Sequence, residues 1–106
     1  MIDKDFERWQ KMSLMEQMAN IGSEVYRASS WRVKNNHDYS QKAFERALEL
    51  IDMTLRCNLR TSALREVARA REALCEAFLE DRSGDLEQNF KSFNKYFHHF
   101  ALGLKR

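Results

Sequence analysis

The stretch EQMANIGSEVYRASSW, Glu16–Trp31, decides the fold class that this sequence predicts. Apolar residues recur in it at alternating spacings of three and four, as at Met18, Ile21 and Val25, which is the period of a helix that buries one face. Gly22 interrupts this helix at a cost of about 1 kcal/mol relative to alanine. Because apolar positions flank Gly22, we interpret it as a place where a second helix approaches closely.

The same period continues through a chain that holds no proline and only three glycines. Helix start and stop signals predict four helices, over residues 14–34, 38–56, 61–81 and 86–104. A short helical turn with Phe6 and Trp9 is expected before them, folded back onto the bundle. Because the connections are short, the sequence predicts an all-α fold, an up-down-up-down antiparallel four-helix bundle in a single domain of residues 1–106.

Capping residues mark three of the predicted helix starts. Ser13 with Glu16, and Asp38 with Gln41, have the spacing of a capping box, in which two side chains bind the free backbone N–H groups of the first turn. Asp85 follows the chain break RSGD and is the predicted cap of the last helix. These caps predict where the helices begin.

The charge balance and the two cysteines narrow the possible setting of the protein. With 18 basic and 16 acidic side chains, the net charge of +2 argues against a strong general attraction to nucleic acid or anionic membranes. The N-terminal stretch has no apolar core of a signal peptide, and no apolar run is long enough to span a bilayer. Cys57 and Cys75 lie far apart within apolar patterns and are expected to be reduced thiols. A cytoplasmic protein is expected.

Motifs that would indicate an enzyme or a metal centre are missing from the sequence. There is no glycine-rich phosphate loop, no G-x-S-x-G, no Glu-x-x-His pair and no zinc-ligand spacing. His98 and His99 are neighbours on a predicted helix and point about 100° apart, so they are poorly placed to hold one ion. We expect no catalytic residues, no cofactor and no metal.

One short pattern resembles a known family. RVKNNH, Arg32 to His37, has the arginine-x4-histidine spacing of the HEPN ribonucleases, which are small helical bundles. In that family the motif lies late in the domain, whereas here it spans a helix end and the following loop. The resemblance implies a substrate-binding or phosphate-binding role for Arg32 and a catalytic role for His37. The helical layout also resembles the small prokaryotic bundle proteins encoded within ribosomal RNA intervening sequences and the bundle partners of nucleotidyltransferases.

The predicted helix 14–34 carries a second apolar stripe beside the first, which includes Met15, Gly22 and Tyr26. This face is wider than one helix–helix seam needs. It leads to the hypothesis of a non-enzymatic interaction module that self-associates as a dimer or docks a helical partner protein. The candidate interface residues are Trp9, Gly22, Tyr26 and Trp31.

The predicted helix 61–81 has an unusual charge order, with basic residues early and acidic residues late, against the helix dipole. Two explanations remain open for its arginines, Arg65, Arg69 and Arg71 among them. Asp52 or Glu49 of the preceding helix pairs with them, or they form an exposed ridge for an acidic partner or for phosphates.

The last predicted helix places basic residues opposite its phenylalanine seam, with Tyr96 at the border in position to stack on a base. Together with the arginines they favour RNA binding as the alternative function. The candidate nucleic-acid-binding residues are Arg65, Arg69, Lys91, Lys95 and His99.

Overall fold

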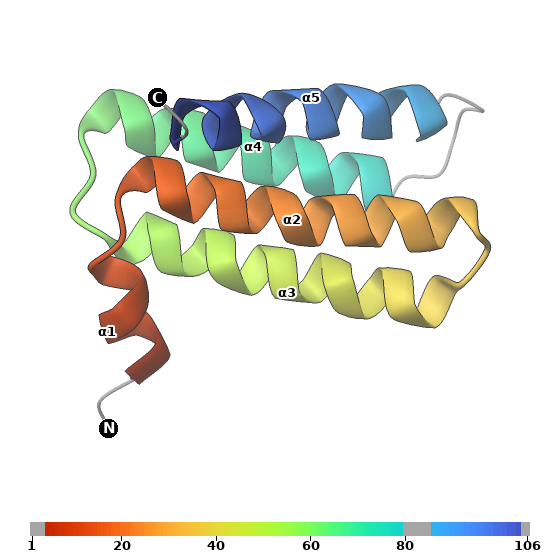
Figure 1. Ribbon diagram of the computed structural model, residues 1–106, viewed down its shortest axis with the longest axis horizontal. Coiled ribbons are helices and arrows are strands. Elements are labelled where there is room, and N and C mark those ends of the chain that lie inside the picture. Colours follow the sequence, from red (N-terminus) through yellow and green to blue (C-terminus); the bar gives the residue numbers. More distant parts are fainter. Residues whose placement is uncertain (1–3, 80–85, 105–106) are drawn as a thin grey trace.

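The computed structural model describes residues 4–79 and 86–104, and within them the chain is helical and contains no strand (Figure 1). The helices are α1 Lys4–Gln10, α2 Leu14–Val33, α3 His37–Arg56, α4 Thr61–Leu79 and α5 Leu86–Leu104. The all-α prediction is therefore confirmed, and the predicted N-terminal turn is the short helix α1. The predicted end of α4 at residue 81 and the Asp85 cap lie outside the described residues.

Helices α2 to α5 form the predicted up-down-up-down bundle (Figure 1). Helix α2 packs closely along both α3 and α5, and α4 makes looser contact with α3 and α5. Helix α1 lies across the end of the bundle, where it contacts α3. The closest packing of the bundle is thus centred on α2, and its least closely packed seam is the one between α4 and α5.

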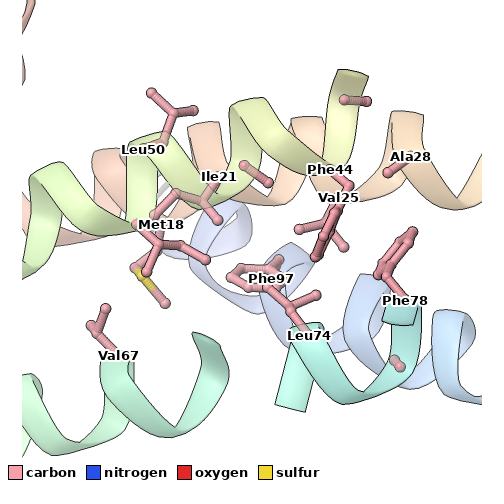
Figure 2. Close-up of a cluster of buried hydrophobic side chains, with 14 of the residues drawn as sticks. Met18, Ile21, Val25, Ala28, Phe44, Leu50, Val67, Leu74, Phe78 and Phe97 are labelled. Atoms are coloured by element: carbon pink, nitrogen blue, oxygen red, sulfur yellow. The ribbon is translucent and has the colours of Figure 1, made fainter. Parts of the chain in front are cut away.

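The core is formed by the apolar stripes that the sequence predicts. Met18, Ile21 and Val25 of α2 point toward Leu74 of α4 and Phe97 of α5 (Figure 2). Each of these five side chains is at most 2% exposed. Burying an apolar side chain of this size contributes about 1.5–3 kcal/mol, so this layer is a main source of the stability of the fold.

Gly22 allows the close helix approach that its position predicts, and the approaching helix is α5 of the same chain. A Cβ atom placed on Gly22 would lie 2.5 Å from Cβ of Phe97, closer than two carbon atoms can pack. The absence of a side chain at Gly22 is therefore what lets α2 and α5 come together at this level. The loss of helix propensity is offset by packing inside the bundle.

The Ser13 cap of the first predicted box is confirmed, and Glu16 contacts the Ser13 side chain instead of its backbone N–H. Ser13 Oγ accepts the backbone N–H of Glu16 at 3.1 Å and lies 3.2 Å from Glu16 Oε1. These contacts start α2 at the next residue after Ser13. Because the capping side chains are local in sequence, this helix start was predictable from the sequence alone.

The second predicted box, Asp38 with Gln41, is wrong. Asn35 has a φ of 61°, a left-handed conformation that asparagine tolerates better than most residues. The chain turns at Asn35, and α3 therefore begins before Asp38. Asn36 then becomes the cap, and its side-chain oxygen accepts the backbone N–H of Tyr39 at 3.1 Å. Gln41 lies free of the cap and its amide donates to Glu45 at 3.2 Å.

Trp9 is a core residue, which corrects its prediction as an interface residue. Its side chain is only 7% exposed, and its indole N–H donates to Thr54 Oγ1 of α3 at 2.8 Å. The side-chain amide of Gln17 donates to the Trp9 carbonyl at 2.8 Å. Because α1 folds back over the bundle end, the indole covers the end of the core and is unavailable to another molecule.

Candidate functional site: the groove between α4 and α5

The four predicted interface residues do not form one surface. Trp9 and Gly22 are used in packing within the chain. Tyr26 is 61% exposed and lies beside Gly22 at a groove of about 430 Å³ between α2 and α5. Trp31 is half-buried, with its ring edge-on to Tyr39 at 4.9 Å. Trp31 follows Tyr26 by five positions, which places the two side chains about 140° apart around α2.

A larger groove, of about 740 Å³, follows the seam between α4 and α5, and we call it the α4–α5 groove. It exists because α4 presents small side chains to α5 where the two helices pack loosely. Ala70 and Ala73 are half-buried there and leave space beside the ring of Phe93. The lining residues are Ser62, Arg65, Glu66, Arg69, Ala70, Ala73, Ser92, Phe93 and Tyr96.

Two predicted basic residues, Arg65 and Arg69, line the α4 side of this groove. Both are exposed, and no ion pair of either arginine is found among the side chains that the structure describes. Arg71 differs, because its guanidinium binds Asp52 of α3 at 2.8 Å and this contact raises the pKa of Arg71. Of the two explanations for the arginines, cross-helix pairing thus applies to Arg71, and an exposed pair applies to Arg65 and Arg69.

Glu49, the other acid considered as a partner for the α4 arginines, lies 3.1 Å from Arg46 of its own helix. It therefore leaves Arg65 and Arg69 uncompensated from the α3 side. The exposed Arg46–Glu49 ion pair contributes little to stability. Two exposed arginines with no acid of α3 beside them form a site that attracts negative charge.

The α5 side of the groove is lined by Ser92, Phe93 and Tyr96, and none of the predicted basic residues of α5 is part of that lining. Lys91, Lys95 and His99 are exposed. Lys91 and Lys95 directly precede Ser92 and Tyr96, so each is turned about 100° away from a lining residue. Of the five predicted nucleic-acid-binding residues, only Arg65 and Arg69 line the groove.

Tyr96 joins the two helices across the groove. Its hydroxyl donates to Glu66 Oε1 of α4 at 2.8 Å, and its ring stands edge-on to Phe97 with the centroids 5.0 Å apart. Burial of the phenol, reinforced by the hydrogen bond to Glu66, holds the pKa of Tyr96 well above its ordinary value. Because both the ring and the hydroxyl have partners in the chain, Tyr96 is less available for base stacking than the sequence indicated.

The Tyr96–Glu66 contact predicts a late step in alkaline titration. We expect one tyrosine to gain phenolate absorbance at higher pH than a free tyrosine, and the substitution Tyr96→Phe to remove that step. Tyr39→Phe, at an exposed position, should retain it. The unfolded chain releases this proton from about pH 10 upward and the folded chain does not, so stability should fall as the pH rises above that value. Equal titration curves for Tyr96→Phe and the unmodified protein would contradict this contact.

The residues of the HEPN-like pattern lie on either side of the α2–α3 turn. Arg32 is half-buried in the last turn of α2, and His37 is exposed as the first residue of α3. Residues 34–38, His37 among them, line a shallow hollow. This hollow shares no lining residue with the α4–α5 groove. Cys57 and Cys75 are free thiols.

Neither a metal centre nor a membrane span is found in the described part of the chain. No group of three or more histidine, cysteine, aspartate or glutamate side chains is arranged there to hold an ion. None of its helices combines the length and the apolar character needed to cross a bilayer.

Comparisons with known protein families, with curated proteins and with solved structures find no match to this chain.

The groove was only partly predictable from the sequence. Its basic residues stood out through their charge order, but the sequence-based interpretation missed Ser62, Ala70, Ala73, Ser92 and Phe93 as parts of one site. A signal was available, since alanines recur on one face of α4 at a spacing of three. Small side chains of this kind usually mark close packing of helices, and here they border open space instead.

Proposed function

We propose that this protein is a non-enzymatic interaction module that docks a partner protein in the α4–α5 groove. The observation that carries the proposal is the combination of half-buried Ala70, Ala73 and Phe93 with the exposed Arg65 and Arg69 in one groove. Grooves between helices with an apolar floor are used by proteins to hold an added helix. The docking hypothesis from the sequence is kept, and its location moves from the face of α2 to the seam of α4 and α5.

The packing of the bundle supports this location. Helix α2 is covered on both sides by α3 and α5, and its second apolar stripe is partly used against α5 at Gly22. Helix α4 has looser contacts with its neighbours. A docked segment would bury the exposed parts of Phe93 and the two alanines, and burial of apolar area is the main favourable term in most protein association.

A photo-reactive amino acid in place of Ser92 tests the proposal. We expect it to crosslink one partner protein in the source cells, and we expect the same group at Lys11, an exposed residue of the α1–α2 connection, to give no such product. Binding of the purified partner should then be lost on Ser92→Trp, which fills the groove from its exposed edge. Circular dichroism would verify that the variant is folded.

Three results would contradict docking in the groove. They are equal crosslinking from Ser92 and Lys11, unchanged partner binding by the Ser92→Trp variant, and crosslinking from Ser92 only to a second copy of this chain. The last result would favour the dimer that the sequence predicts in place of a separate partner.

RNA binding is a second candidate, favoured by the exposed Arg65 and Arg69 at the same groove. If both contact phosphates, affinity for single-stranded RNA should fall about sevenfold between about 50 and 200 mM salt. We rank this function second because the ring and the hydroxyl of Tyr96 have partners within the chain, which makes Tyr96 less available to stack on a base. No binding of an unstructured RNA at the lower salt concentration would exclude it.

A further inference from the structure

We propose that the partner segment held by the α4–α5 groove is an acidic amphipathic helix, with aspartate or glutamate along the edge of its apolar stripe that faces α4. This inference depends on the proposed docking function and adds the chemistry of the occupant.

The charged side chains that line the groove lie on α4. Arg65 and Arg69 are basic, and the one acidic lining residue, Glu66, accepts the hydroxyl of Tyr96. The lining therefore carries an excess of positive charge on its α4 side. Complementary charge across an interface speeds association and selects partners more than it adds affinity. An occupant with acids along the edge that faces Arg65 and Arg69 matches this arrangement.

The length of the groove suits a short helix. Its α4 wall runs from Ser62 to Ala73, which at the rise of an α-helix is about 16 Å, or about three helical turns. Three turns place side chains i, i+4 and i+7 of a docked helix over the floor at Ala70, Ala73 and Phe93. Arg65 and Arg69 are one turn apart, so acids spaced four residues apart on the occupant would face both of them.

A second copy of this chain does not supply such a helix from its described residues. Large exposed apolar side chains there are Met15, Tyr26, Val33, Tyr39 and Leu64. The most acidic exposed face is on α3, at Asp38, Glu45, Glu49 and Asp52. Only Tyr39 accompanies these acids as a large exposed apolar residue, so α3 lacks the apolar stripe that would enter the groove.

Two synthetic peptides test the inference. Each is a helical peptide of about 15 residues with leucine at i, i+4, i+7 and i+11, and the flanking positions are glutamate in one peptide and lysine in the other. In fluorescence anisotropy at low salt we expect the glutamate peptide to bind at least about tenfold more tightly. Its affinity should fall by about tenfold in the double variant Arg65→Glu, Arg69→Glu.

The matched control is the double variant Lys4→Glu, Lys11→Glu. It makes the same change in net charge at two exposed residues, one in α1 and one in the connection that follows it. This control should bind the glutamate peptide within about twofold of the unmodified protein. An equal loss of affinity in the control and in the arginine variant would mean that general charge attraction, not the groove, holds the peptide, and would overturn the inference.

Other outcomes separate this inference from the proposed function. If both peptides bind equally and Ser92→Trp blocks both, the groove docks helices but does not select acids, so this inference fails and the docking function stands. If neither peptide binds, the acidic-helix inference fails, and the crosslink from Ser92 decides the docking function separately. If an unstructured RNA displaces the glutamate peptide and is itself released by the arginine variant, the occupant is nucleic acid and both proposals fail.

Discussion

Replacing Gly22 with alanine is expected to lower the free energy of unfolding by about 1–3 kcal/mol, the usual cost of adding a methyl group to a filled site. The added Cβ would lie 2.5 Å from Cβ of Phe97 and 3.2 Å from its Cγ. These atoms are next to the backbone of α5, so relief requires the two helices to move apart. Such a movement would loosen the buried contacts on either side of the crossing.

Helix propensity alone predicts that Gly22→Ala raises the free energy of unfolding, because replacing glycine with alanine inside an exposed helix stabilises the helix by about 1 kcal/mol. Chemical denaturation of the two proteins therefore separates packing from propensity. Ser23→Ala is the matched control, one residue away on α2 and exposed, and it should change stability by less than about 0.5 kcal/mol. A Gly22→Ala variant that is more stable than the unmodified protein would show that α5 does not approach α2 closely at this point.

Replacing Trp9 with alanine should cost about 3–5 kcal/mol, as expected for removal of a large buried aromatic side chain. The indole closes the end of the core and donates to Thr54, which is 0% exposed. Without the indole N–H, the Thr54 hydroxyl loses a buried partner. Trp9→Phe keeps most of the apolar contact and should cost less, about 1–3 kcal/mol for the unmatched hydroxyl.

Trp31→Ala is the control for this experiment, because Trp31 is half-buried and contacts mainly the exposed Tyr39 and Lys34. We expect its effect to be near 1 kcal/mol. Thermal and chemical unfolding measure both variants. If Trp9→Ala left stability unchanged and weakened association instead, the original interface prediction for Trp9 would be restored.

The four long helices were predictable because their signals are local. Alternating apolar spacing is written in each segment, and the residues that cap α2 are three positions apart. The cap of α3 was predicted two residues too late, at Asp38 instead of Asn36, since two plausible caps stand close together. The left-handed conformation of Asn35 selects the earlier one.

The location of the candidate site was less predictable. Arg65, Arg69, Lys95 and His99 were each singled out by charge and spacing, but only the two arginines line the groove. Charge gives no information about which faces of two helices meet. Arg71 illustrates the limit, because it belongs to the same predicted arginine group and is paired with Asp52 across the bundle. Which arginine is paired depends on the rotation of α4 against α3.

The sequence by itself determined the helical class, the approximate helix bounds and the need for a close neighbour at Gly22, because each follows from the pattern of residue types within a few positions of the chain. Only the tertiary structure decided that this neighbour is Phe97, that Trp9 is buried, and that an open groove lies between α4 and α5. The physical reason is that helix rotation and spacing are set by how side chains far apart in the sequence fill space together.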